Sequence, residues 1–500
     1  MERKEEALHN IERTSSEGPE KLTGYAQMTT LEEKRLVRKI DRNVVPLMVI
    51  FYLLSFLDRT NIGNARLNGL EKDLKLSDYD YRIALTILYV PYIAFELVSN
   101  LLVKKVGAKL WLPSLVVMWG IVGTLQGVVK DKHGLWADRF FLGLTEAGIL
   151  PAIILYLASW YKPHELQLRI GMFWVASSLA GSLGGLLAAA LGLIRAGGLN
   201  GWSWIFIIEG IITVVAGVIG YFLMPNDVER SNFLTPEEKE QVATRMISPT
   251  GHSEVHEQFS WSEVGSVFKS LHMWLLMIMA FGSGVAVYSV AYFLPTILAG
   301  LGKRSVWVTQ LLSVPPYALS AICSLAGSYY SDKVKQRTPF VIFPQLVAIA
   351  GLAILYTCTR DKRAFGARYF AIMILVSGIY TAVPAYLALA SNSFANHYRR
   401  ATALAMMIVM TNSGGLASTW LYRKNEAPNY QKGYMTVIAL LSLATIAAVI
   451  LRFHFARINK KRDVLCDTAR GSSHGDEPVV AGQAIKADAG DRSIHFRYTL

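Results

Sequence analysis

Two adjacent charged residues, Asp58 and Arg59, stand at the end of the apolar run VVPLMVIFYLLSF. They lie about 14 residues into a predicted helix, or roughly 21 Å from its start, which would be past the midplane of a bilayer but still in hydrocarbon. A charge at such a depth costs about 3 kcal/mol or more and usually marks a substrate or proton pathway. Alternatively, the two charges neutralise each other at a frayed helix end, where the arginine can extend toward the membrane surface.

A second charged pair occurs in the segment RFFLGLTEAGILP, where Arg139 and Glu146 are seven residues apart with Gly143 between them. Two helical turns place both side chains on one face, and Glu146 falls about 16 Å from the start of its apolar run. Burial favours the neutral form of a carboxylate, whereas a nearby arginine favours the charged form. A carboxylate balanced in this way suits a proton-coupled carrier; the alternative is a structural arginine–glutamate tie within one helix.

Other polar residues in apolar runs are less specific. Tyr288 and Tyr292 are one turn apart and could line a cavity or simply pack. Glu96 lies near a basic loop, and Glu209 lies near two tryptophans. For both glutamates we favour a structural role.

The chain carries few signs of an enzyme. HSEVH (252–256) does not have the HExxH spacing of a zinc site, and we expect no metal there. The cysteines Cys323, Cys358 and Cys466 are too widely spaced for a disulfide framework or a zinc cluster. Without a phosphate-binding loop or a nucleophile elbow, we predict a protein that is not an enzyme and needs no cofactor.

The composition is that of an integral membrane protein. Of the 500 residues, 52% are hydrophobic and only 17% are charged, whereas soluble domains are about one-quarter charged. Apolar runs of about 20 residues recur along the chain, which is the length needed for a helix to cross a bilayer. We therefore predict an all-α, polytopic membrane protein with twelve transmembrane helices in two halves of six.

The predicted organisation has five segments. They are an N-terminal segment (1–43), a first six-helix half (44–223), a central loop (224–270), a second six-helix half (271–455) and a polar, disordered tail (456–500). The expected spans are about 44–65, 83–103, 110–129, 135–158, 170–194, 203–223, 271–297, 307–330, 339–358, 368–391, 400–421 and 434–455.

Charge next to the apolar runs predicts the orientation. The net charge of +13 is concentrated in flanks such as KRLVRK and RFHFARINKKR, a distribution typical of cytoplasmic flanks rather than of nucleic-acid binding. KKVGAK and SDKVKQR are basic loops at corresponding places in the two halves, which favours an internal repeat. We expect both termini in the cytoplasm, a plasma-membrane location, no nucleic-acid partner and a functional monomer in the lipid bilayer.

Several motifs together resemble one family. They are LDRTNIGNA, LVSNLLVKKVGAKLWLP, RFFLGLTEAGILP, GWSWIFIIEG, FLPTI, SDKVKQRTP, NHYRRATALAMMIVMTNSGG and NEAPNYQKGY. The chain resembles a major facilitator superfamily carrier of the anion:cation symporter family, in the fungal branch typified by allantoate permease. The resemblance implies alternating-access transport of a small organic anion such as allantoate, nicotinate, pantothenate, biotin or ureidosuccinate, with protons as the coupling ion.

The same resemblance implies roles for particular residues. Asp58 and Glu146 match protonatable carboxylates, Arg59 matches the arginine that receives a substrate carboxylate, and Arg139 matches its partner in the fourth span. Asn412 matches a substrate-binding asparagine of the eleventh span.

Two further features follow the family pattern less closely. Ser177 occupies roughly the place of a polar contact in the fifth span. The loop motif after the second span lacks its usual aspartate, which survives only in the second copy as Asp332. A weaker latch between the halves is expected in the first copy.

The sequence leaves the direction of transport open. Proton symport into the cell is the leading interpretation, an exporter or vacuolar carrier of an acidic secondary metabolite is the second, and a transporter-like nutrient sensor is the third. We expect spans one, four, seven and eleven to face a shared cavity that Gly143 and Asn412 line, together with Tyr288 and Tyr292. Val117 of span three is expected to face the lipid.

Overall fold

The computed structural model describes residues 30–246, 261–302, 304–358, 365–394, 397–427, 429–471 and 496–499. The segment HSEVH lies outside the described residues. The helices are α2 (Thr30–Thr60), α3 (Ile62–Leu67), α4 (Leu70–Asp73), α5 (Asp78–Ile87), α6 (Tyr89–Val106), α7 (Ala108–Gln126), α8 (Lys132–Glu146), α9 (Ile149–Ala158), α10 (Pro163–Leu191), α11 (Gly201–Leu223), α12 (Pro236–Met246), α13 (Trp261–Phe268), α14 (Leu271–Ala299), α15 (Val306–Leu311), α16 (Val314–Val334), α17 (Pro339–Cys358), α18 (Phe365–Asn392), α19 (His397–Ser418) and α20 (Gln431–Gly471), with a 3-10 turn at Lys424–Glu426.

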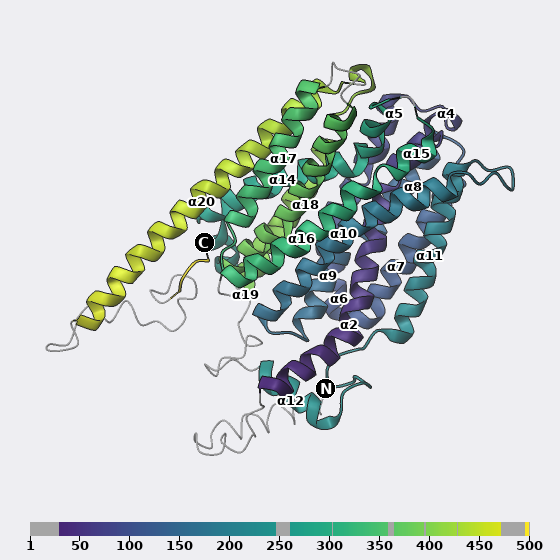
Figure 1. The fold of residues 1–500 in the computed structure, drawn as a ribbon. Coiled ribbons are helices and arrows are strands. Elements are labelled where there is room, and N and C mark those ends of the chain that lie inside the picture. The colour runs from purple at the N-terminus through teal and green to yellow at the C-terminus, as the bar shows by residue number, and fades with distance from the viewer. Residues whose placement is uncertain are drawn as a thin grey trace.

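The predicted all-helical fold is confirmed, and long helices run up and down through one bundle (Figure 1). In the described part of the chain, eleven helical segments are long and apolar enough to cross a membrane, against twelve predicted. The second predicted span, 83–103, is helical in α5 and α6 but is interrupted at Leu88. Glu96 and the basic pair at the end of α6 shorten its apolar run further.

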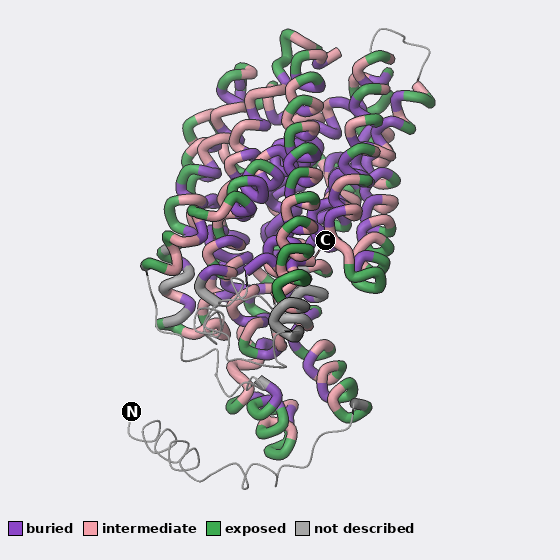
Figure 2. Tube along the Cα trace, turned by 90° about the vertical axis from the view of Figure 1, so that its left-hand side faces the viewer, coloured by how far each residue is buried: buried purple, intermediate pink, exposed green. Residues whose placement is uncertain are grey.

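Apolar side chains cover the outside of the bundle as well as its middle. Phe222, Phe343 and Phe453 are 82%, 69% and 70% exposed on three different helices. In a soluble protein such a surface would promote aggregation, whereas in a bilayer it contacts lipid. Polar residues such as Arg139 and Glu209 lie inside, and Figure 2 shows buried residues gathered along the middle of the helices.

The helices fall into two groups by their contacts. Those from α2 to α11, called here the N-terminal group, and those from α14 to α20, the C-terminal group, pack mainly within their own group, except α10 and α15. Between the groups, α10 packs against α15, α16 and α18, while α3 contacts α14 and α6 contacts α19. A cavity on the line between the groups is therefore bordered by helices from both.

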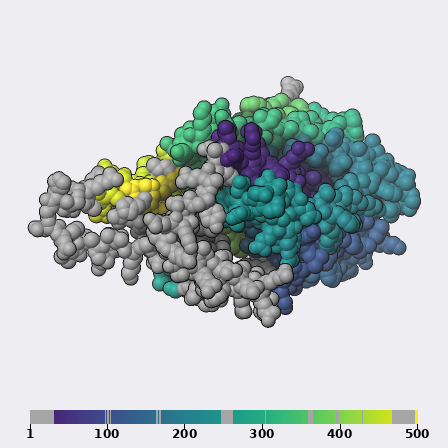
Figure 3. Space-filling view, turned by 90° about the horizontal axis from the view of Figure 1, so that it is seen from below, coloured from purple at the N-terminus to yellow at the C-terminus, as the bar shows by residue number. Residues whose placement is uncertain are grey.

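We call the end of the bundle where α2 begins and α20 ends the terminal end, and the opposite end the distal end. At the terminal end, α12 of the central loop is held against the first part of α2 by an ion pair between Lys39 and Glu238 at 2.6 Å. Figure 3 shows this end of the bundle, where the purple start of α2 lies beside teal residues. Arg245 of α12 also pairs with Glu165 at the start of α10. The central loop is thus partly a helix bound to the N-terminal group.

The prediction of a disordered tail is wrong for its described parts. Helix α20 continues to Gly471, past the predicted end of the last span at 455. The segment 496–499 packs against it: Tyr498 stacks on Phe455 with ring centroids 4.3 Å apart. Asn459 binds the backbone of Tyr498 through two hydrogen bonds of 2.8 and 2.9 Å. The tail is polar on average, but Phe496 and Tyr498 provide local apolar contacts that an average composition does not reveal.

Candidate functional site

Arg59 forms a buried ion pair with Glu146. Its Nη2 lies 2.9 Å from Glu146 Oε1, and its Nε donates to Oε2 at 3.3 Å. Arg59 is 5% exposed and Glu146 1% exposed. The two N–H groups meet both carboxylate oxygens, which is the bidentate geometry that arginine offers and lysine does not.

A break in the fourth predicted span positions Glu146. Helix α8 ends at Glu146 and α9 begins at Ile149, with Gly148 between them at a φ of +81°. Glycine adopts this left-handed conformation without steric cost. Because the last turn of a helix carries negative partial charge, a carboxylate there is unfavourable without a cation. Arg59 supplies that cation from α2.

Hydrogen bonds extend from this pair across the bundle. Ser55, one turn before Arg59, donates its hydroxyl to Glu146. On the other side, Arg59 Nη1 donates to the Tyr288 hydroxyl at 3.0 Å, and that hydroxyl donates to Asn412 Oδ1 at 2.9 Å. The chain of contacts therefore joins α8 and α2 of the N-terminal group to α14 and α19 of the C-terminal group.

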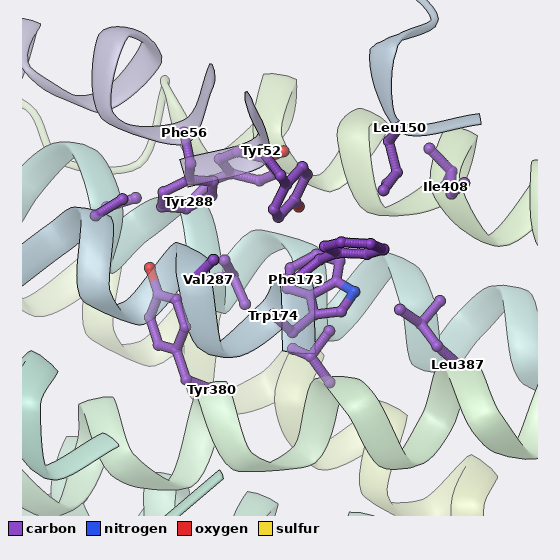
Figure 4. Packing of buried hydrophobic residues seen from close by; sticks show 14 of the residues in the cluster. Tyr52, Phe56, Leu150, Phe173, Trp174, Val287, Tyr288, Tyr380, Leu387 and Ile408 are labelled. Atoms are coloured by element: carbon purple, nitrogen blue, oxygen red, sulfur yellow. The ribbon is translucent and has the colours of Figure 1, made fainter. Parts of the chain in front are cut away.

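A narrow cavity lies beside Arg59. Aromatic rings from α2, α6, α10 and α14 line it, and Phe56 stacks on Tyr288 while Tyr52 packs against Trp174 (Figure 4). The lining residues are Tyr52, Ser55, Phe56, Arg59, Tyr92, Ile149, Leu150, Trp174, Tyr288, Leu387, Ile408, Thr411 and Asn412.

The cavity thus combines one cation with apolar and aromatic walls. The guanidinium of Arg59 also lies over the ring of Tyr92, 4.6 Å from its centroid, and this cation–π contact stabilises the buried charge. A small ligand with a carboxylate at one end and an apolar or ring-shaped body at the other fits this distribution of groups. The expectation that four spans line the cavity is incomplete, because spans two, five and ten also contribute.

A second cavity continues from the first toward the terminal end. The two share Leu150, Trp174, Leu387 and Ile408 in their walls. The second cavity then reaches Ser391, at the end of α18. Small spaces between side chains therefore occur on the terminal side of Arg59.

The distal end is closed by contacts between the two groups of helices. The hydroxyls of Tyr89 and Tyr292 are 2.8 Å apart, and those of Thr86 and Thr419 are 2.9 Å apart. Nearer the distal surface, Lys424 lies 3.3 Å from Glu71. We call these three contacts the distal seal.

Asp58 faces away from Arg59. Its Oδ2 accepts hydrogen bonds from Trp119 Nε1 and Thr213 Oγ1, both at 3.0 Å. The interpretation that Asp58 and Arg59 neutralise each other is wrong, because adjacent side chains on a helix point about 100° apart and these two contact different helices. The sequence-predicted proton carriers Asp58 and Glu146 therefore occupy separate places.

Arg139 does not pair with Glu146, although the two share one helix. Arg139 donates to the backbone oxygen of Arg59 at 3.5 Å. With its amide oriented to satisfy the surrounding donors and acceptors, Gln126 accepts from Arg139 Nη2 at 2.9 Å and donates to Asp138 at 3.0 Å. Arg139 thus connects α8 to α2 and α7, and it is absent from the cavity wall.

Three further predicted positions also lie off the cavity wall. The hydroxyl of Ser177 donates to the backbone oxygen of Trp174 at 2.7 Å, and it is Trp174 that reaches the cavity. Tyr292 belongs to the distal seal. Gly143 packs so closely against Leu88 that a Cβ there would lie 2.0 Å from the Leu88 backbone oxygen, so the prediction that Gly143 faces the cavity is wrong.

Val117 is half-buried, so the prediction that it faces the lipid holds only in part. A Cβ at Gly217 would meet Val117, which shows that Val117 packs against α11, whereas its neighbour Met118 is exposed. Sequence reasoning also missed Ser55 and Tyr92. Ser55 is one turn from Arg59, a spacing that could have identified it, whereas Tyr92 is brought to Arg59 only by tertiary packing.

The comparisons with known proteins agree with this architecture. The family model described as Major Facilitator Superfamily matches residues 48–419. An uncharacterised transporter of Schizosaccharomyces pombe is 34% identical over 87% of this chain and 86% of its own. The high-affinity nicotinic acid transporter of Saccharomyces cerevisiae is 31% identical over 93% of this chain and 85% of its own.

Solved structures are similar in fold at low sequence identity. A bacterial homologue of the human lysosomal transporter Spinster superposes with a TM-score of 0.63 at 15% identity, covering 81% of this chain and 95% of its own. The D-xylose–proton symporter gives a TM-score of 0.62 at 15% identity, covering 81% and 96%. The chain is a multi-pass membrane protein that belongs to the major facilitator superfamily.

Proposed function

We propose that the protein is a secondary active transporter that carries a small organic anion into the cell together with protons. The observation that carries the proposal is the ion pair between Arg59, which lines the cavity, and Glu146, which lies behind the cavity wall. A fixed cation whose counter-ion is itself titratable can exchange that counter-ion for a substrate carboxylate. The similarity to a nicotinic acid transporter supports a carboxylate substrate and the anion:cation symporter branch typified by allantoate permease.

Competition for Arg59 couples the proton to the substrate. When Glu146 is charged, it occupies Nε and Nη2 of Arg59, which are the donors a substrate carboxylate would need. A proton on Glu146 removes its negative charge and frees these donors. The incoming anion then restores neutrality at the site. Loss of the proton returns Arg59 to Glu146 and releases the substrate.

The remaining cavity residues orient the substrate. Ser55 donates to whichever form of Glu146 is present, and Tyr288 with Asn412 presents a hydroxyl and an amide beside Arg59. The aromatic walls bind the body of the substrate by apolar contact. Because the distal seal joins the two groups of helices while the cavity continues toward the terminal end, the two groups rock about the cavity during transport.

The proposal also includes the orientation and the cellular location of the protein. The terminal end faces the cytoplasm, the protein resides in the plasma membrane, and a monomer carries out transport in the bilayer. Basic residues at the start of α2 and the end of α20 support this orientation, because the cytoplasmic flanks of membrane helices carry an excess of lysine and arginine.

An uptake screen tests the function. Cells lacking their own carriers would express the protein and receive labelled nicotinate, pantothenate, allantoate, biotin or ureidosuccinate, with and without a protonophore. We expect accumulation of one acid, its loss with the protonophore, and no competition from the neutral amide. Accumulation that is unchanged by the protonophore would exclude proton symport. Faster loss of a preloaded acid would instead favour the exporter.

A further inference from the structure

One hydrogen-bond donor in the cavity wall has no partner. The indole N–H of Trp174 is buried, and no acceptor for it is present among the described residues. Trp174 is 6% exposed and lines both cavities. An indole nitrogen can only donate, and a buried donor that is left unpaired is unfavourable. The site therefore lacks one hydrogen-bond acceptor.

The walls around Trp174 explain why no protein group meets this N–H. Leu150 of α9, Leu387 of α18 and Ile408 of α19 line both cavities together with Trp174, and their hydrocarbon side chains contain no acceptor. Figure 4 shows the indole nitrogen on the side of Leu387. Because Trp174 and Leu150 belong to the N-terminal group while Leu387 and Ile408 belong to the C-terminal group, movement of one group against the other opens the space beside the indole.

Trp174 and Arg59 stand at two ends of one cavity wall. Trp174 packs edge-on against Tyr52 of α2, with ring centroids 6.1 Å apart. Tyr52 and Arg59 are seven residues apart, so they share one face of α2 at a separation of about 10 Å along the helix. A hydrogen bond of about 3 Å at each end leaves about 4 Å between the two acceptor atoms of a bridging ligand. A carboxylate oxygen and an acceptor on the far side of a single ring have about this separation.

The wall between the two donors is aromatic. Tyr52 and Phe56 lie along α2 on this stretch, and Phe56 stacks on Tyr288. Rings of this kind favour a flat ligand body, because aromatic groups pack well in offset and edge-on arrangements. They contact any ring of suitable size, so they do not distinguish one flat acid from another. Discrimination therefore depends on the polar groups at the two ends, Arg59 and Trp174.

We propose that Trp174 determines substrate specificity by donating a hydrogen bond to an acceptor on the side of the substrate opposite its carboxylate. This inference rests on the proposed function and narrows the substrate class to ring-containing carboxylates with a lone pair on the far side of the ring, such as heteroaromatic acids. Arg59 binds the carboxylate, and Trp174 binds the second acceptor. An acid of the same shape without that lone pair leaves the indole N–H unpaired and binds more weakly.

Binding of three acids to the detergent-solubilised wild-type protein tests the proposal. Benzoate has a C–H where nicotinate has its ring nitrogen, and picolinate has the nitrogen next to the carboxylate. We expect nicotinate to bind at least about fivefold more tightly than benzoate, and picolinate to bind no better than benzoate. Equal binding of all three acids would overturn the inference, and so would binding of none of them while another carboxylate is transported. If no carboxylate binds at all, the proposed function itself is wrong.

The substitution Trp174→Phe assigns the preference, because phenylalanine keeps an aromatic wall but has no N–H. We expect the ratio of nicotinate affinity to benzoate affinity to fall to about one. Trp160→Phe is the matched control: it removes the N–H of a buried tryptophan that lines neither cavity, and it should keep the wild-type ratio. An unchanged ratio in Trp174→Phe, or an equal fall in Trp160→Phe, would overturn the assignment. If Trp174→Phe does not fold, the comparison of nicotinate with picolinate in the wild type decides, since these acids differ only in the position of the nitrogen.

Discussion

Asp58 and Arg59 are neighbours in the chain but contact different helices. Arg59 binds Glu146 of α8 and Tyr288 of α14, while Asp58 accepts hydrogen bonds from Trp119 of α7 and Thr213 of α11. One turn of α2 therefore presents a cation to the cavity and an anion to the interior of the N-terminal group. In the proposed mechanism, this separation lets one short motif contribute to both substrate binding and proton binding.

Glu146→Gln should abolish proton-driven accumulation but preserve exchange of bound substrate. Glutamine cannot hold Arg59 as an anion does, so Arg59 stays available at every pH. In the wild-type protein, apparent affinity for the substrate anion should decrease as pH rises, because the deprotonated glutamate reoccupies Arg59. In the variant the affinity should be independent of pH. Binding measured from pH 5 to 9 checks this, and a variant that still concentrates substrate along a pH gradient contradicts the assignment.

Arg59→Lys should reduce apparent affinity for the substrate by at least about tenfold, equivalent to about 1.4 kcal/mol. Lysine keeps the charge but loses the planar arrangement of N–H groups that now meets Glu146. Titration of binding in detergent, after confirming expression and monodispersity, measures the change. Arg169→Lys is a useful control, since Arg169 pairs with Asp41 at the terminal end, away from the cavity. Equal losses in both variants would remove Arg59 from the site.

The sequence predicts the helices and much of the cavity because both follow from local patterns. Apolar run lengths determine the spans, and charged residues within them identify Arg59 and Glu146. The partners of those residues depend on which face each helix presents to its neighbours. Arg139 and Glu146 share a helix face by spacing, but the turn at Gly148 and the packing of α2 direct Glu146 toward Arg59 instead.

The partner of Glu209 also could not be predicted from the sequence. Its position beside tryptophans at a helix start is typical of a structural residue, and its sequence context contains no partner. Only the packing of α11 on α2 brings it to Asn61. Long-range juxtapositions of this kind cannot be obtained from the periodicity of a single segment.

Gly143→Ala should destabilise the protein. An added Cβ would lie 2.0 Å from the Leu88 backbone oxygen, so α8 and the α5–α6 segment would have to separate. Overpacking of this kind costs about 1–3 kcal/mol. Gly171→Ala, also within a helix but with no atom within 4 Å of the new Cβ, should be neutral or stabilising by up to about 1 kcal/mol. Thermal unfolding in detergent compares the two, and equal melting temperatures would contradict the close contact.

Cysteine labelling should distinguish the cavity from the lipid-facing surface. Asn412→Cys and Ser391→Cys should react with a small, polar, membrane-impermeant reagent added at the terminal end, because both positions line connected cavities. Substrate should protect Asn412→Cys, which is beside Arg59, and leave Ser391→Cys reactive. Met118→Cys, exposed on the lipid side of α7, should not react because the thiol is not in water. Labelling at Met118→Cys with none at Asn412→Cys would contradict the cavity.

Weakening the distal seal should favour a conformation that is open at the distal end. Tyr89→Phe or Tyr292→Phe removes the hydrogen bond of 2.8 Å between helices of the two groups. Such a bond contributes about 1 kcal/mol, which corresponds to roughly a fivefold shift in a two-state equilibrium. We expect Asn412→Cys to label up to about fivefold faster from the distal side and more slowly from the terminal side. The double substitution should add little to either single one, because both remove the same bond.

Tyr156→Phe is the matched control for the distal seal. Its hydroxyl donates to the backbone oxygen of Pro225 at 2.8 Å, which is a bond within the N-terminal group and its adjoining loop at the terminal end. Its removal should therefore leave distal labelling unchanged, although a comparable hydrogen bond is lost. If Tyr156→Phe accelerated distal labelling as much as Tyr89→Phe, general loosening of the bundle would explain the effect. The Tyr89–Tyr292 contact would then not govern access to Arg59.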